Sequence, residues 1–192
     1  MSLLTLSLEP VLKLTEEQFA RLCRVNPELL LERTAVGELQ IMSPTGGETG
    51  LMNAELVAQL VLWNRQTRQG IVFDSSTGFR LSNGAIRSPD VAWIKRERWE
   101  ALSPSQRRGF VPLCPDFVLE LCSPTDDWEA LQTKLREYLA NGLRLGWLLD
   151  PAGRVEIYRS GQLAELQTRP ATLSGENVLP EFVLNLTEIL KP

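Results

Sequence analysis

The chain has 192 residues, of which 43% are hydrophobic and 23% charged, which suits one domain with a sizeable core and argues against disorder. It contains no histidine, which excludes Ser-His-Asp and Cys-His catalytic groups and every histidine metal site. With a net charge of -4, the chain lacks the overall excess of basic residues that is typical of a nucleic-acid-binding protein, although an acidic protein can still carry a local basic patch.

The N-terminal stretch and the cysteines bear on location. "MSLLTLSLEP" has no basic segment, so we expect no secretion signal, and no apolar run reaches the length of a membrane span. Cys23, Cys114 and Cys122 are odd in number, and their spacing suits no zinc site. Such lone thiols indicate a reducing compartment, which predicts a cytoplasmic protein without a membrane partner.

A helix and a hairpin are predicted first. Residues 15–24 read as a short helix, because Thr15 can cap it and Gln18 completes a capping box. Residues 29–42 read as a β-hairpin that turns near Ala35–Gly37.

A loop, a second helix and two strand-like segments follow. The stretch "SPTGGETG" at 43–50 is a loop by composition, and apolar residues at helical spacing predict an amphipathic helix over 50–66. Residues 70–81 and 85–94 read as strand-like segments around a turn. The polar stretch 95–110 predicts a helix plus a loop.

The second half completes an α/β pattern. Residues 116–121 form a strand, and residues 127–141 a helix with a C-cap signal at Asn141–Gly142. Residues 144–150 and 154–160 are two further strands, before a loop and a short closing element. This order predicts a central mixed β-sheet with helix 50–66 on one face and helix 127–141 on the other.

One glutamate lies where a charge is costly. In "CPDFVLELCSP" at 114–124, Glu120 interrupts a run that is apolar on both pleat faces, as in a central strand. A carboxylate there loses hydration, which costs several kcal/mol unless it is paired, protonated or metal-bound. Glu120 therefore needs a partner.

A second carboxylate opens a neighbouring strand. Asp90 follows Pro89 and shares a pleat face with Ala92 and Ile94. If this strand lies beside 116–121, Asp90 and Glu120 converge, within about 5 Å of each other, and a divalent cation would remove their repulsion. Oxygen ligands without histidine favour Mg²⁺ or Mn²⁺.

A lysine borders the buried face of the following helix. Lys134 lies about 80° from the centre of the helix's apolar stripe, taking 100° per residue. Its stem can therefore pack while its ammonium reaches a polar site at the sheet. The stripe consists of Trp128, Leu131, Leu135, Tyr138 and Leu139.

These segments together resemble a known family. "SPTGGETG", "FDSSTGFRL", "RSPDVAW", "PDFVLELCSP" and "KLREYLANGLRLGWLLDP" are similar to motifs of the PD-(D/E)XK nuclease superfamily, and more closely to the Uma-type bacterial family of restriction endonucleases, formerly a domain of unknown function. The likeness covers roughly residues 40–190. One position departs from the superfamily pattern, because Cys122 stands where lysine is expected. In the Uma-type family that lysine has moved to the following helix, where Lys134 matches it.

The resemblance implies a restriction-endonuclease-like core over 46–192, with the helix and hairpin of 1–45 as an N-terminal extension of the same single domain. It implies a Mg²⁺- or Mn²⁺-dependent endonuclease acting on nucleic acid, with DNA expected. Asp90, Glu120 and the backbone carbonyl of Leu121 would hold the metal, and Lys134 would orient or help deprotonate the attacking water. Glu48 or Glu55 could supply a further acid.

Two other functions stay open on the sequence. The chain could be a catalytically silent relative that binds nucleic acid or regulates, or a metal-dependent hydrolase of small phosphoesters. Retention of both acids and the lysine counts against the silent relative. A basic cluster in "KRERWE" and "QRRGF" suits phosphates and favours the nuclease.

Each candidate residue also has a purely structural interpretation. Asp90 could simply begin a strand after a proline. Glu120 could pair with Arg80 or Arg87, and Lys134 with Tyr138 or Glu137. Cys122 reads as a packed thiol, because no histidine is present to activate it.

A homodimer is expected by analogy, since many nucleases of this type pair subunits to reach both strands. The apolar segments "VEIY" at 155–158 and "LNLTEIL" at 184–190 are the candidate surfaces.

Overall fold

A six-stranded mixed sheet forms the centre of the computed structural model, which describes residues 3–6 and 13–190. The strand order is β11-β10-β9-β8-β7-β4. β8 pairs antiparallel with β7 and parallel with β9, so it lies inside the sheet, as its continuous apolar run predicts. The strands are β4 (Gly70–Asp74), β7 (Val91–Lys95), β8 (Phe117–Leu121), β9 (Leu145–Leu149), β10 (Arg154–Arg159) and β11 (Glu165–Thr168).

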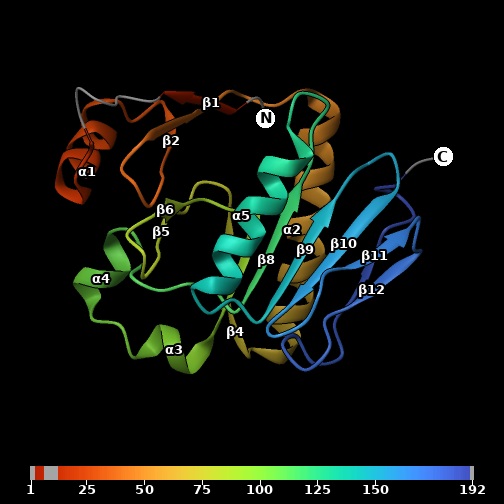
Figure 1. Ribbon diagram of the computed structural model, residues 1–192. Helices are drawn as coiled ribbons and strands as arrows, with labels where there is room; N and C mark the ends of the chain where they lie inside the picture. The colour runs from red at the N-terminus through yellow and green to blue at the C-terminus, as the bar shows by residue number, and fades with distance from the viewer. Residues whose placement is uncertain (1–2, 7–12, 191–192) are drawn as a thin grey trace.

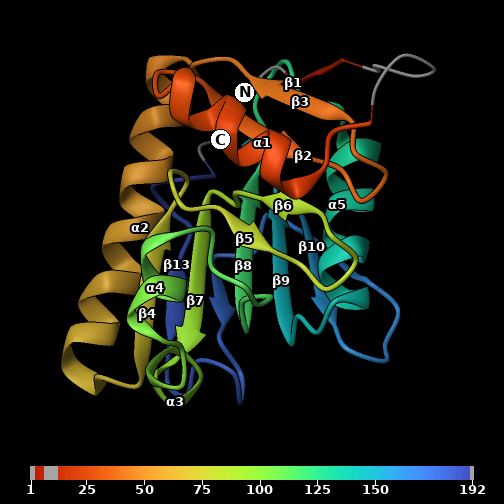
Figure 2. The same cartoon turned by 90° about the vertical axis from the view of Figure 1, so that its left-hand side faces the viewer.

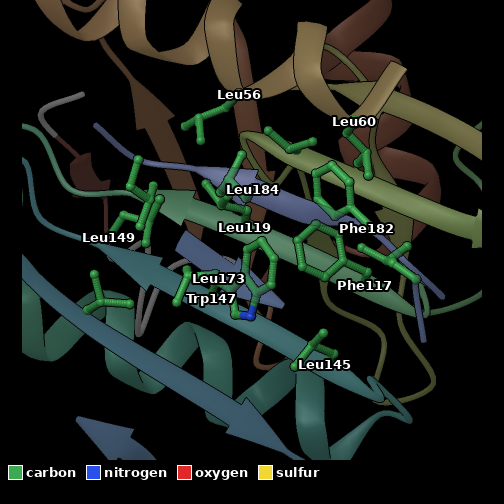
Figure 3. Packing of buried hydrophobic residues seen from close by; sticks show 14 of the residues in the cluster. Leu56, Leu60, Phe117, Leu119, Leu145, Trp147, Leu149, Leu173, Phe182 and Leu184 are labelled. Atoms are coloured by element: carbon green, nitrogen blue, oxygen red, sulfur yellow. The ribbon is translucent and has the colours of Figure 1, made fainter. Parts of the chain in front are cut away.

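Two helices cover opposite faces of this sheet, which confirms the predicted arrangement (Figure 1). Helix α2 (Gly47–Thr67) packs on the face that carries Leu119 of β8. Helix α5 (Trp128–Ala140) packs on the face that carries Val118. Figure 3 shows the first of these two clusters, in which the side chains of Leu56, Leu60, Phe117 and Trp147 lie together.

The capping signals place most helix ends correctly. Helix α1 (Glu16–Val25) begins after Thr15, and Thr15 and Gln18 form the predicted capping box. Helix α5 ends before Asn141, and Gly142 has a φ of 103°. Helix α2 begins at Gly47, inside the segment predicted as loop, where Thr49 is already buried. Tertiary burial therefore outweighs the poor helix propensity of Gly47 and Gly50.

A second sheet lies across one end of the first (Figure 2). It has the order β1-β3-β2-β6-β5, and α1 packs on it through Phe19. The predicted hairpin forms β2 and β3, and β2 pairs with β6 through Arg33 and Ile86. This sheet therefore combines strands of the expected N-terminal extension (1–45) with strands of the expected core (46–192). Its strands are β1 (Leu3–Leu6), β2 (Leu30–Arg33), β3 (Leu39–Met42), β5 (Phe79–Arg80) and β6 (Ile86–Arg87).

Three predicted elements are divided in the structure. The strand-like segment 70–81 forms β4 and β5, with a turn between Asp74 and Thr77, and 85–94 forms β6 and β7 on either side of Pro89. Proline has no N–H for a strand ladder, so a break at this position is expected. The stretch 95–110 forms two short helices, α3 (Arg96–Glu100) and α4 (Pro104–Arg108), because Ser103 caps a new helix with Pro104 at its first position.

The C-terminal part contains strands that the sequence did not reveal. Strand β11 extends the central sheet, and β12 (Thr172–Ser174) pairs with β13 (Val183–Asn185). This hairpin lies against α2, where Gln59 bonds both the backbone N–H and the carbonyl of Asn185.

The two surfaces predicted for a homodimer are wrong. Residues 155–158 belong to β10, which pairs with β9 and β11 and buries its apolar side chains in the clusters on the two faces of the sheet. The apolar residues of 184–190 pack in the same core cluster as α2. The predicted segments therefore stabilise the subunit itself and are not free to form an interface.

Two observations bear on the location of the protein. Within residues 3–6 and 13–190, no helix is long and apolar enough to cross a membrane. Cys23, Cys114 and Cys122 are free thiols.

Gly146 of β9 determines how closely α5 approaches the sheet. A Cβ at this position would lie 2.7 Å from a methyl carbon of Leu135 and 2.9 Å from one of Leu143, in a closely packed core. We expect Gly146→Ala to lower the free energy of unfolding by roughly 1–3 kcal/mol, because overpacking strains the core. Urea unfolding measures the change. Gly109→Ala is the matched control, since nothing lies within 4 Å of a Cβ there; equal stability of the two variants would contradict the packing argument.

Candidate active site

Asp90 and Glu120 meet where β7 begins and β8 ends. The antiparallel register pairs Ala92 with Val118, and two residues further along it brings Asp90 opposite Glu120. Both side chains lie on the face covered by α5, since Ala92 and Val118 belong to the core cluster on that face. Oδ2 of Asp90 accepts a hydrogen bond of 2.8 Å from the backbone N–H of Leu121, which ties the two strands together at this point.

Lys134 of α5 reaches the same place. Its Nζ lies 2.9 Å from Oε1 of Glu120, and only 13% of its side chain is exposed. Its ammonium enters the polar site at the sheet, as the helical geometry predicts. The lysine is the partner that the buried Glu120 requires.

A third carboxylate, which was not predicted from the sequence, is a second partner of Lys134. Glu32 of β2 is 1% exposed, and its Oε1 lies 2.9 Å from Nζ of Lys134. The same oxygen accepts a hydrogen bond of 2.7 Å from the backbone N–H of Ser88. Lys134 therefore lies between two buried carboxylates that come from different sheets.

Arg87 holds Glu32 from the other side. Its Nη1 lies 3.1 Å from Oε2 of Glu32, and its Nε lies 2.6 Å from Oε2 of Glu137. Arg87 also donates a hydrogen bond to Gln40 of β3. The charges alternate in sign along one connected chain, in the order Glu120, Lys134, Glu32, Arg87 and Glu137.

The electrostatics separate the roles of the carboxylates. Burial raises the pKa of Glu120 to about 8, and the charges of Asp90 and Glu32 add to this against the opposing effect of Lys134. Burial also raises the pKa of Asp90. Burial acts to raise the pKa of Glu32 as well, but the charges of Lys134 and Arg87 outweigh it and lower that pKa. Glu32 is thus the ionised partner, whereas Glu120 retains a proton more readily.

The pKa of Lys134 is shifted in the direction that keeps its charge. Burial alone would lower this pKa, but Glu120 and Glu32 together raise it above its usual value. The side chain is therefore an ammonium throughout the physiological pH range.

These residues line a cavity of about 560 Å³. Its walls hold two cations, Arg87 and Lys134, against six carboxylates. Such an acidic lining repels a phosphate group unless a cation is bound. The carboxylates belong to Glu32, Asp90, Glu120, Asp126, Asp127 and Glu137.

The two acids expected from the first long helix lie elsewhere. Glu48 and Glu55 are exposed on α2, and neither lines the cavity. Asn53, on the same helix, donates a hydrogen bond of 3.5 Å to Oδ1 of Asp90. The acid that joins the site is Glu32, and its signal in the sequence is weaker than that of Glu120: it follows a short run of leucines in the strand Leu30–Arg33 and is itself followed by an arginine.

The arginines proposed as structural partners of Glu120 are used differently. Arg80 pairs with Glu16 of α1 at 3.0 Å, and Arg87 pairs with Glu32 and Glu137. Cys122 is buried, as expected for a packed thiol, and burial raises the pKa of that thiol to about 11.

The predicted basic cluster is remote from the cavity. Asp90 precedes the first residue of β7, whereas Lys95 is its last residue and α3 follows it, so this cluster starts at the opposite end of the strand. The charges in the first part of the cluster are also engaged locally: Lys95 pairs with Glu97, Arg96 with Glu100, and Arg98 with Asp116.

The chain is similar to a known family in sequence and to a solved structure in fold. A model of the Uma2 family, described as "Putative restriction endonuclease", matches residues 16–187. A solved structure, described as a putative nuclease belonging to DUF820 from Anabaena variabilis, is similar with a TM-score of 0.70 and 19% sequence identity. The similarity covers 83% of this chain and 89% of that one. No curated protein sequence matches the chain significantly.

The raised pKa of Glu120 predicts a pH-dependent effect of Glu120→Gln. The folded wild type holds this proton up to pH about 8, whereas an ordinary glutamate releases it near 4.5. Between these values the folded state binds more protons than the unfolded state, so the wild-type free energy of unfolding falls relative to that of the variant as pH rises. The slope for one proton is roughly 1.4 kcal/mol per pH unit.

Urea unfolding of both proteins in metal-free buffer, at about pH 5 and about pH 8, measures this effect. We expect the variant to gain stability over the wild type at the higher pH. Parallel stability curves would show that Glu120 is ionised across this range.

Proposed function

Since the chain belongs to the Uma2 family, we propose that it is a metal-dependent endonuclease of the PD-(D/E)XK type, acting on DNA. The observation that carries this proposal is the meeting of Asp90, Glu120 and Lys134 in one cavity, from two adjacent strands and the helix that covers them. Asp90 and Glu120 match the motif of the superfamily, and Lys134 matches the position to which the lysine has moved in the Uma-type family.

The side chains present fit a hard divalent cation. Asp90 and Glu120, with the backbone carbonyl of Leu121, would offer only oxygen ligands, which Mg²⁺ and Mn²⁺ prefer. Among the described residues no group of three or more His, Cys, Asp or Glu is arranged as a ready metal cage. Mg²⁺ tolerates this, because it is commonly held by one or two carboxylates and keeps several waters.

When bound, such a cation polarises the phosphate and activates water. The protein's own contribution begins with Asp90, whose Oδ2 is fixed by the N–H of Leu121 at 2.8 Å. Glu120 is held on the central strand, and burial raises its pKa to about 8, so a cation competes with a proton as well as with Lys134 for this carboxylate.

Lys134 acts as a charged donor. Because its carboxylate neighbours raise its pKa, it retains its proton and is a poor general base. Of the two roles suggested by the sequence, the ammonium is suited to orienting the attacking water and stabilising negative charge on the phosphate. Cys122, at the position where the superfamily has lysine, is buried and takes no part in this chemistry.

We also propose that the protein is cytoplasmic and dimeric. The three free cysteines support a reducing compartment. Two copies would reach both strands of a duplex, an argument that rests on analogy with nucleases of this type.

One observation favours a second candidate, hydrolysis of a small phosphoester. The basic cluster that supported nucleic-acid binding begins at the far end of β7 from Asp90, and the cations of its first part, Lys95–Arg98, are engaged in ion pairs. A substrate confined to the cavity of about 560 Å³ would not need this cluster.

Metal-dependent cleavage tests the proposal. With Mg²⁺ or Mn²⁺ present, the wild type should nick supercoiled plasmid DNA, and Asp90→Asn and Glu120→Gln should each lower the rate by at least about 100-fold. Circular dichroism checks that the variants fold. Glu129→Gln removes an exposed carboxylate on α5 and should cleave as the wild type does.

The other outcomes separate the alternatives. Hydrolysis of bis(p-nitrophenyl) phosphate without cleavage of DNA or RNA would favour the small-phosphoester enzyme. Metal binding without hydrolysis of any of these substrates would identify a silent relative. Cleavage that both variants retain in full would overturn the assignment of the site.

A further inference from the structure

Lys134 has two carboxylate partners at equal distance, and only one of them is a proposed metal ligand. Nζ lies 2.9 Å from Oε1 of Glu120 and 2.9 Å from Oε1 of Glu32. A cation bound to Glu120 draws that carboxylate's charge away from the ammonium. The position of Lys134 in the metal-bound protein then depends on its contacts with groups other than Glu120.

The Glu32 carboxylate is held in place by contacts that do not involve Glu120. Glu32 is 1% exposed, and two groups besides the Lys134 ammonium hold its carboxylate: the backbone N–H of Ser88 at 2.7 Å and the guanidinium of Arg87 at 3.1 Å. Pairing of β2 with β3 holds its backbone. Arg87 is itself held by Glu137 at 2.6 Å. Glu32 cannot follow a movement of Glu120, because it belongs to the other sheet.

We infer that Glu32 is a positioning residue that retains the Lys134 ammonium in the cavity when a divalent cation takes over Glu120. The inference rests on the proposed function, in which Glu120 binds the metal. It gives the N-terminal hairpin a part in the active site, because Glu32 brings to Lys134 a carboxylate that the central sheet does not supply.

The alternating chain of charges explains why one carboxylate can serve this role. Glu32 contacts two cations, Lys134 and Arg87. Glu137 pairs with Arg87 and so balances the second positive charge. Lys134 also donates a weak hydrogen bond of 3.5 Å to the carbonyl of Ser88, the residue whose N–H binds Glu32. The ammonium is thereby fixed to the β2–β6 side of the cavity independently of Glu120.

Chemical labelling of the four lysines tests this inference without measuring activity. Lys134 is largely buried, whereas Lys95 is exposed. Acetylation with an amine-reactive reagent, followed by peptide mass spectrometry, reports the accessibility of each lysine side chain. The wild type and Glu32→Gln are labelled with and without saturating Mg²⁺, and calorimetry shows in parallel whether Mg²⁺ binds.

The inference predicts an effect that depends on the metal. Without Mg²⁺, Glu120 still holds Lys134, so the variant should be labelled only slightly faster than the wild type. With Mg²⁺, Lys134 of the variant should be labelled about tenfold faster or more, because a buried charge-assisted hydrogen bond is lost. Lys95 should label equally in all four samples. A purely structural role of Glu32 would raise labelling equally with and without Mg²⁺.

Glu137→Gln is the matched control. It breaks a buried ion pair of the same chain on the far side of Arg87, without contacting Lys134. It should leave the labelling of Lys134 in Mg²⁺ well below that of Glu32→Gln, and equal labelling of the two variants would overturn the inference.

The wild type alone also provides a test, should Glu32→Gln fail to fold. Lys134 should stay protected when Mg²⁺ is bound, and a loss of protection on Mg²⁺ binding would contradict retention by Glu32. The proposed function fails separately, if the wild type binds no Mg²⁺ at all.

Discussion

The position of one ammonium group between two buried carboxylates organises this protein. Lys134 lies 2.9 Å from both Glu120 and Glu32, and these two glutamates are 3% and 1% exposed. Moving the ammonium and the ionised Glu32 out of water costs several kcal/mol for each ion, which their mutual attraction offsets, whereas Glu120 can hold a proton up to pH about 8. Their close contact, with Arg87 and Glu137 extending the chain, makes this burial possible. Glu32 is the member that contacts both cations, so its loss leaves each of them with one carboxylate partner fewer.

The three groups come from parts of the chain that only the fold brings together. Glu120 is carried by the central strand β8, Lys134 by the helix on one face of the sheet, and Glu32 by a hairpin in the second sheet. Gly146 allows α5 to approach the sheet closely enough for the lysine to reach β8. The larger hydrophobic cluster lies on the opposite face, under α2, so the polar site lies outside it (Figure 3).

Much of this arrangement could be predicted from the sequence. A charge in an apolar run identified Glu120, a shared pleat face linked Asp90 to it, and helical geometry directed Lys134 toward the sheet. These signals are local, and each follows from the cost of burying a charge or from the periodicity of an element. Glu32 carries a weaker local signal than Glu120, because the four-residue strand around it holds only two apolar residues, and nothing in the sequence indicates that its hairpin pairs with β6.

The features that were missed depend on tertiary contacts. Strands β5, β6, β12 and β13 have two or three residues each, too few for a periodic pattern, and pairing with other strands stabilises them. The apolar segments 155–158 and 184–190 look the same in sequence whether they cover a core or an interface. The basic residues after β7 likewise gave no sign that neighbouring carboxylates would pair with them.

A crystal structure with Mn²⁺ tests the central claim most directly, because anomalous scattering locates the ion independently of any activity. The account predicts one peak within about 2.1–2.2 Å of carboxylate oxygens of both Asp90 and Glu120, with Nζ of Lys134 still in contact with Glu32. An absent peak at saturating Mn²⁺, or an ion held by neither Asp90 nor Glu120, would contradict it.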